Sequence, residues 1–202
     1  MRAINKLLKK RGFTLVELMI VVAIIGVLAA LAIYGVRRYL ASSKTSEAKN
    51  TIGAISRGAT AAFERETADS ESVAEGMEST AASHALCGDA TNVPGTVPAG
   101  KKYQPITAEG SDFETGDTLN GWKCLKFGLQ QPHYYQYQYH RDTNPAAPNN
   151  PAGCAAPCYE AGAVGDLDGD AVTAHFARTG EVNAATGKLK AATQIYIENE
   201  FE

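Results

Sequence analysis

The stretch KKRGFTLVELMIVVAIIGVLAALAIYGVRRYL, residues 9–40, decides the fold of this chain because it encodes one long apolar segment. No charged residue occurs in 18–36, and Arg37 and Arg38 close the run. These 19 residues come close to the roughly 20 that a helix needs to cross the hydrocarbon core of a bilayer. The stretch therefore predicts a membrane-spanning helix.

A secretory signal peptide is the first alternative for such a segment. Its apolar region would be shorter, roughly 7 to 15 residues, and its cleavage site would follow that region. Here the basic head ends at Gly12, before the apolar run, so cleavage there would leave the apolar helix on the mature chain. The positive-inside rule keeps the basic head in the cytoplasm and places the C-terminal body outside the inner membrane.

Composition describes the rest of the chain. A length of 202 residues with 45% apolar and 20% charged residues predicts one globular domain behind an N-terminal extension. The first twelve residues hold five of the Lys and Arg residues and no acid, so removing them lowers the formal charge from -3 to -8. An acidic body binds nucleic acid poorly, because affinity for phosphate comes mainly from Lys and Arg.

The motif KRGFTLVE, residues 10–17, followed by the apolar run, resembles the class III leader of type IV pilins and type II secretion pseudopilins. In that family a prepilin peptidase cleaves after the glycine, methylates the new amine and leaves a glutamate fifth in the mature chain. The resemblance implies these roles for Gly12, Phe13 and Glu17. It is close over residues 9 to about 66 and extends to the remainder only in general layout. The chain lacks the proline that the family often carries late in the apolar run.

Glu17 needs a physical explanation, because a carboxylate near the bilayer core costs about 2.5 to 3.5 kcal/mol. An α-amino group, cationic at neutral pH, is the nearest kind of partner. The amine of Phe13 lies one helical turn away, and a staggered neighbouring subunit could also present its own amine and so fix the register of assembly. The alternative is that Glu17 only reaches the lipid headgroups.

The helix is expected to continue beyond the membrane segment, because small and apolar residues recur at steps of three and four. Those residues are Ala48, Ile52, Ile55, Ala59 and Ala62. The expected division is a leader over 1–12, a transmembrane and assembly helix over 13–36, an amphipathic half over 37–66, and a globular head over 67–202.

Strand patterns begin after the helix. The expected strands are GWKCLKFGL (121–129), HYYQYQYHR (133–141), AVTAHFARTGEV (171–182) and TQIYIENEFE (193–202), with a proline-rich loop at 142–157. The resemblance implies an α+β fold in which the long helix packs on an antiparallel sheet of four or so strands.

Tyr135, Tyr137 and Tyr139 alternate with polar residues and predict an aromatic strand face that packs on the long helix. The alternative is a stacking platform for single-stranded nucleic acid, which would want Lys or Arg beside it. Only Arg141 is near.

The four cysteines lie in the part of the chain expected in an oxidising compartment, which favours two disulfides. Three pairings are open, and we favour Cys154 with Cys158 and Cys87 with Cys124, because the first pair is close within the proline-bounded loop. A zinc site is the alternative, although a second CxxC spacing is missing.

The stretch GDLDGDA, residues 165–171, places Asp166, Asp168 and Asp170 where three carboxylates could converge on one hard cation. Calcium is the natural candidate outside the cell. The glycine stands before the third acid, unlike in an EF-hand loop, so the prediction is a weak site. The alternative is an Asp-Gly turn between strands whose acids are simply solvated.

No catalytic motif emerges: GxSxG, HExxH and a glycine-rich phosphate loop are absent, and the four histidines lack metal-ligand spacing. We therefore expect a structural subunit of a type IV pilus, with no enzyme activity and no required cofactor. Its expected partners are identical or related pilins, the prepilin peptidase, the assembly machinery and the inner membrane before export to the cell surface. A type II secretion pseudopilin and a membrane-anchored enzyme or receptor remain the alternatives.

Overall fold

The structure is a computed structural model that describes residues 12–65, 67–68, 82–151, 153–155 and 157–202. It divides into two compact units, Met1–Leu40 and Ala41–Glu202. The basic leader residues that precede Gly12 lie outside the described residues.

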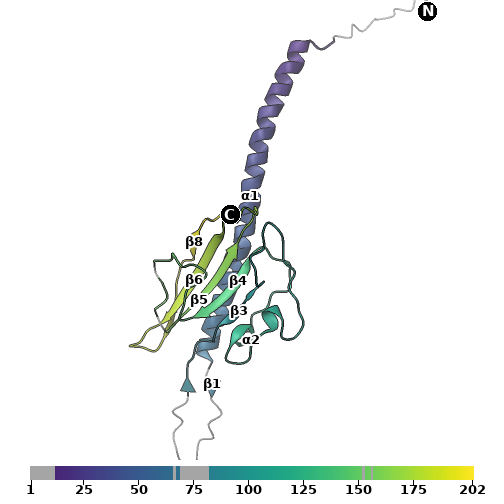
Figure 1. Cartoon of the computed structure of the whole chain (residues 1–202). Helices are drawn as coiled ribbons and strands as arrows, with labels where there is room; N and C mark the ends of the chain where they lie inside the picture. Colours follow the sequence, from purple (N-terminus) through teal and green to yellow (C-terminus); the bar gives the residue numbers. More distant parts are fainter. Residues whose placement is uncertain (1–11, 66, 69–81, 152, 156) are drawn as a thin grey trace, which may run out of the picture. The chain divides into compact units, whose positions relative to one another are not determined.

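One long helix, α1 (Leu15–Glu64), dominates the N-terminal part of the chain (Figure 1). Its 50 residues correspond to about 75 Å at 1.5 Å per residue. Within the second unit it buries one face, and this face carries the residues expected from the helical spacing. Those residues are Ala48, Ile52, Ile55, Ala59 and Ala62, each at most 4% exposed. The predicted helix and its buried face are therefore confirmed.

The head is built on one antiparallel sheet. Its strands are β3 (Ala90–Val93), β4 (Gln136–Arg141), β5 (Cys158–Gly165), β6 (Ala174–Val182), β7 (Leu189–Ala191) and β8 (Tyr196–Glu198). The order along the sheet is β3-β4-β5-β6-β7, and β8 also pairs with β6. A separate two-residue pair joins β1 (Thr67–Ala68) to β2 (Ala82–Ser83). This α+β arrangement confirms the expected fold class, although the sheet has six strands rather than about four.

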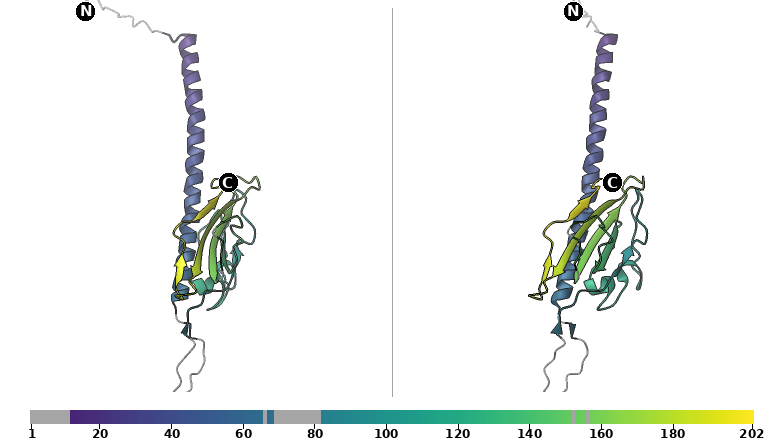
Figure 2. Two further views of the ribbon diagram at one scale, coloured as in Figure 1. Left: turned by 90° about the vertical axis from the view of Figure 1, so that its left-hand side faces the viewer. Right: turned by 60° about the vertical axis from the view of Figure 1, so that its left-hand side comes forward.

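The head portion of α1 lies along one face of this sheet (Figure 2). Tyr135, Tyr137 and Tyr139 are fully buried in the shared core, so the predicted aromatic face is confirmed. Polar contacts also join the two layers, and in one of them the hydroxyls of Ser56 on α1 and Tyr159 on β5 lie 2.7 Å apart. Burial of these large aromatic rings between helix and sheet supplies much of the stabilisation of the head.

The strand predicted over 121–129 is wrong, because this segment begins with a short helix, α2 (Gly121–Leu125). Gly121 enters it with φ +73°, and Lys126 ends it in the left-handed conformation at φ +50°. A short helix brings Trp122 and Leu125 onto the same side, and both are at most 2% exposed. The Trp122 indole also donates to the carbonyl of Thr91 on β3, so tertiary contacts override the alternating pattern.

Strand β5 was missed by the sequence analysis, which carried only a loop up to residue 157. Its sequence CYEAGAVG is rich in Ala and Gly, residues that are uncommon in strands, yet all eight positions are buried. Small side chains are needed because both faces are covered at short range. A Cβ on Gly165 would lie 2.4 Å from the Tyr135 ring, and one on Gly162 would lie 2.1 Å from the Cβ of Ala146.

Candidate functional site

The junction between Gly12 and Phe13 lies outside the helix. Residues 12–14 carry no regular secondary structure, and Phe13 is 94% exposed. Because α1 begins at Leu15, the peptide bond between Gly12 and Phe13 is presented in non-helical, accessible backbone. Such backbone is the conformation that proteases bind and cut most readily.

Thr14 and Glu17 form a reciprocal cap on the first turn of α1. The Thr14 hydroxyl accepts the Glu17 N–H at 3.2 Å, and the Glu17 carboxylate accepts the Thr14 N–H at 2.8 Å. The Thr14 hydroxyl also donates to the same carboxylate oxygen, Oε2, at 2.8 Å. This is a capping box, which satisfies backbone donors that the helix leaves without partners.

The sequence analysis assigned Glu17 an amine partner and missed Thr14. The T-x-x-E spacing at the start of an apolar run could have identified the cap. Within the chain, the carboxylate therefore has a local role that precedes any contact with a neighbouring subunit. Its other oxygen, Oε1, takes no part in the capping box and is free to face a second group.

The apolar side chains that follow are exposed all around the helix. Val21 is 51% exposed and Leu31 is 65% exposed, and the most apolar window of α1 has no buried residue in the described structure. By length and composition this segment could cross a membrane. Free energy of burial is about 25 cal/mol per Å² of apolar surface, so such a segment strongly favours lipid or other copies of itself over water.

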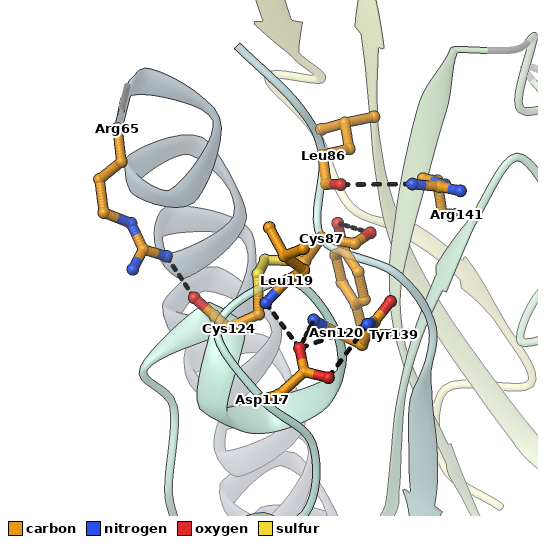
Figure 3. The surroundings of a disulfide bond; sticks show 9 residues. All are labelled: Arg65, Leu86, Cys87, Asp117, Leu119, Asn120, Cys124, Tyr139 and Arg141. Carbon is orange, nitrogen blue, oxygen red and sulfur yellow. Dashed lines mark hydrogen bonds between the residues drawn. A yellow bond between two sulfur atoms is a disulfide. The ribbon is translucent and has the colours of Figure 1, made fainter. Parts of the chain in front are cut away.

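The cysteines pair as the sequence analysis favoured. Cys87–Cys124 joins the chain ahead of β3 to α2, and Cys154–Cys158 closes a small ring at the start of β5. Figure 3 shows the first disulfide beside the end of α1, where the Arg65 guanidinium donates to the carbonyl of Cys124. Cys87, Cys124 and Cys158 are buried and Cys154 is half-buried, and the two disulfides leave no free thiol among the described cysteines.

Around that disulfide, Asp117 organises the turn before α2 (Figure 3). Its carboxylate accepts the backbone N–H groups of Leu119 and Asn120 at 2.7 and 2.8 Å. These hydrogen bonds, that of Leu119 foremost, hold the pKa of Asp117 below its usual value. The charged carboxylate thus fixes the loop that delivers Cys124 to Cys87.

Asp166, Asp168 and Asp170 do converge in the structure. One carboxylate oxygen from each lies within 4.8 Å of the others. Asp166 is 5% exposed, and its two oxygens accept the N–H groups of Gly169 and Ala171 at 2.6 and 3.1 Å. This arrangement fits a tight turn, in which the carboxylates accept backbone N–H groups. It also fits a cation loop, because each carboxylate oxygen that accepts one N–H keeps a second lone pair for a cation.

One groove on the head lies beside β6 and has a volume of about 490 Å³. Its polar lining includes Asn150, Thr179, Lys190, Gln194 and Tyr196. It is an open surface depression that contains none of the residues singled out from the sequence. Nothing in its lining pairs a nucleophile with a base, so it offers no catalytic arrangement.

Comparison with known proteins adds independent findings. The family model described as the prokaryotic N-terminal methylation motif matches residues 7–33. The type IV major pilin protein PilA of Myxococcus xanthus is 60% identical over 47 residues, which cover 23% of this chain and 21% of that protein. The fimbrial protein of Pseudomonas aeruginosa is 47% identical over 54 residues, covering 27% and 35%. No solved structure matches the chain.

One relative is similar over most of its length. The type IV major alpha-pilin of Moraxella bovis is 32% identical over 144 residues, which cover 62% of this chain and 91% of that protein. The matches to the Myxococcus and Pseudomonas proteins span only 21% and 35% of those proteins and are confined to 47 and 54 residues. Since that match covers 91% of the Moraxella protein at 32% identity, this chain belongs to the type IV pilin family, whose members are structural subunits rather than enzymes.

Proposed function

We propose that the chain is the repeating subunit of a type IV pilus filament. The observation that carries this proposal is the apolar segment of α1, which is exposed all around and preceded directly by an accessible Gly12–Phe13 junction. A single exposed apolar helix fits the bilayer before assembly and close packing against copies of itself afterwards. The inner membrane would hold the subunit with its head outside the cytoplasm, and the fibre would lie at the cell surface.

Processing is the first step of this proposal. Prepilin peptidase would cleave between Gly12 and Phe13 and methylate the Phe13 amine. The capping box supports this step, because it starts the helix at Leu15 and leaves the scissile bond in non-helical backbone. Mass spectrometry of purified filaments should find N-methylated Phe13 as the first residue. A chain that retains Met1, or one that begins within the apolar segment, would contradict the proposal.

Glu17 would then hold the register of assembly. A carboxylate and an amine about 4 Å apart attract each other by about 4 kcal/mol at an effective dielectric constant near 20, which is enough to select one stagger. The Oε1 atom left out of the capping box can meet the Phe13 amine of a neighbouring subunit while Oε2 stays on Thr14.

Two variants separate charge pairing from helix capping. Glu17→Gln keeps an oxygen for the cap and removes the charge, whereas Thr14→Ala removes the cap and keeps the charge. We expect Glu17→Gln to insert into the membrane but to abolish filaments by electron microscopy, and Thr14→Ala to assemble. Normal piliation in Glu17→Gln would limit Glu17 to capping and headgroup contact. The pseudopilin alternative predicts a different outcome: cells that carry the unmodified chain would show no surface filaments, and loss of the chain would impair protein secretion.

We also propose a weak calcium site at Asp166, Asp168 and Asp170, supported by the 4.8 Å convergence of their oxygens. Backbone carbonyls and water would complete the oxygen shell, with affinity about 10⁻⁴ to 10⁻³ M as in extracellular modules. Millimolar calcium should raise the melting temperature of the protein, chelator should reverse the rise, and Asp168→Asn should remove it. A melting temperature that ignores calcium would assign these residues to the turn alone.

A further inference from the structure

Residues 142–151 of the proline-rich loop, termed the strap, cover the sheet on the face opposite to α1. Successive residues of a strand point to opposite faces, and Tyr159 points to Ser56 on α1. Glu160 therefore points away from α1, and its Oε1 accepts the N–H of Ala146 in the strap at 2.8 Å. The strap is thus the second covering layer of the sheet.

Two side chains of the sheet hydrogen-bond to the backbone of Ala146 in the strap, one to its N–H and one to its carbonyl. Glu160 on β5 accepts its N–H, and His175 on β6 donates from Nδ1 to its carbonyl at 2.7 Å. Ala146 and Ala147 are fully buried, and Gly162 provides the space for the Ala146 methyl group. Asp142 anchors the start of the strap by accepting the N–H of Cys158 at 3.0 Å. The strap is seated tightly by polar contacts as well as by packing.

Glu160 is an unusual residue for this position because it is a fully buried carboxylate. Its Oε1 holds the strap, while its Oε2 is buried without a hydrogen-bond partner among the described residues. A buried charge without a partner is costly, whereas a protonated carboxyl group at the same place carries no charge. Burial accordingly raises the pKa of Glu160 to about 7.

The neighbours of Glu160 provide no compensating positive charge. The cross-strand partner on β4 is His140, whose Nε2 is also buried without a partner in the described structure and whose pKa is lowered by burial. The partner on β6 is Thr179, and the diagonal position carries the exposed Glu181. His175 contacts Ala146 rather than Glu160. The backbone N–H groups of Ala146 and Ala147 lower the pKa of Glu160, but no cationic side chain in the described structure hydrogen-bonds to its carboxylate.

We propose that the strap is a pH-dependent latch, closed over the sheet while Glu160 is protonated and released when Glu160 ionises. In the closed state the proton resides on Oε2 and Oε1 still accepts the Ala146 N–H. Loss of that proton to solvent leaves a buried negative charge, and lifting of the strap lets water reach it. The strap opens more readily at high pH because the negative charge is less stable when it is buried under the closed strap than when it is hydrated under the open strap.

The direction and size of the effect follow from proton linkage. The pKa of Glu160 is about 7 with the strap closed and would return to its ordinary 4.5 in the hydrated open state. The closed state therefore binds the proton more tightly, and raising the pH favours opening. The opening equilibrium constant should rise about tenfold per pH unit between these values, or about 300-fold in total, and level off outside them.

Amide hydrogen exchange of the full-length chain in detergent micelles tests the latch. The exchange rates of Ala146 and Ala147, corrected for the intrinsic pH dependence of exchange, report strap opening. We expect the corrected rates to rise about 300-fold from pH 4 to pH 8. The amide of Ala163, which lies in the central strand β5, should stay protected throughout because the sheet remains intact.

Two matched variants make the test specific. Glu160→Gln is close to isosteric, keeps an oxygen for Ala146 and cannot ionise, so its strap protection should be independent of pH. Glu181→Gln removes an exposed acid on the same face and should keep the full pH response. A constant strap protection in the unmodified chain would overturn the proposal. So would an equal response in Glu160→Gln, or a parallel rise at Ala163, which would show global unfolding.

Discussion

The two parts of α1 use similar residues in opposite ways. Ile24, in the unit Met1–Leu40, is 54% exposed, whereas Ile52, in the unit Ala41–Glu202, is fully buried. In the second unit the apolar residues occupy one face and the sheet covers it. In the first unit they lie all around the helix, so an element packed on one side could not bury them all. The apolar side chains of α1 in the head are thus covered by the sheet of the same chain, whereas those of the first unit can be covered only by lipid or by other copies of the chain.

Removal of the disulfide Cys87–Cys124 should cause the largest loss in the free energy of unfolding of the head. It closes 37 residues, and the chain-entropy relation assigns such a loop about 4 kcal/mol. The double variant Cys87→Ala with Cys124→Ala should lose that stability in denaturant titrations followed by Trp122, the single tryptophan. The matched loss of Cys154–Cys158, which closes 4 residues, should cost about 2 kcal/mol. Equal losses would contradict the loop-length account, and membrane insertion should be unchanged in both.

The free energy of unfolding of the head should depend on pH through Glu160, which lies in the head, and not through Glu17, which lies in the apolar segment. The pKa of Glu160 is raised from 4.5 to about 7 in the folded head, so its stabilisation is complete below pH 4.5 and is lost as the pH rises to 7. That difference amounts to about 3 kcal/mol. Denaturant titrations at pH 4.5 and 7.5 should show this loss in the unmodified chain and not in Glu160→Gln. Glu17→Gln, in the apolar segment, should behave as the unmodified chain does.

Truncating the two isoleucines would test the comparison directly. Ile52→Ala leaves a cavity between helix and sheet and should destabilise the head by about 3 kcal/mol. Ile24→Ala removes the same atoms from an exposed position and should change the stability of the head by less than about 0.5 kcal/mol. Unfolding followed by Trp122 fluorescence measures both. A comparable loss in Ile24→Ala would show that the apolar segment helps to fold the head.

The smallest effect is expected at the start of α1. Thr14→Ala removes the hydroxyl that accepts the Glu17 N–H and should weaken the first turn by about 1 kcal/mol. The Glu17 amide should then exchange about fivefold faster in micelles, because its local opening becomes easier. Ser46→Ala, which removes a hydroxyl bound to the Ser42 carbonyl in mid-helix, is the control and should leave that amide unchanged.

Several features could be predicted because their causes are local. The apolar run, the glycine before it and Glu17 are contiguous, and the buried face of α1 follows from the spacing of Ile52 and its neighbours. The tyrosines of β4 alternate with a strand period and are buried as expected. Cys154 and Cys158 are near each other in any fold, which favours their pairing.

Other features depend on contacts between distant segments. The segment 121–129 has apolar residues that suit either a strand or a helix, and only the placement of Trp122 against β3 selects α2. The burial of Gln136 and Gln138 could not be inferred, since it arises from the second cover of the sheet. Strand β5 is rich in Ala and Gly for a similar reason, because its small side chains make room for layers on both faces.

Glu160 marks the boundary between the two kinds of information. By itself the sequence determined an apolar helical segment within the N-terminal methylation motif, an amphipathic helix and a β-rich head, because those patterns are periodic or contiguous along the chain. Only the tertiary structure decided that one acid among many is buried under the strap with its Oε2 unpaired. Burial of a residue is a property of all the segments that surround it, and the free energy of its charge follows from that burial rather than from its place in the sequence.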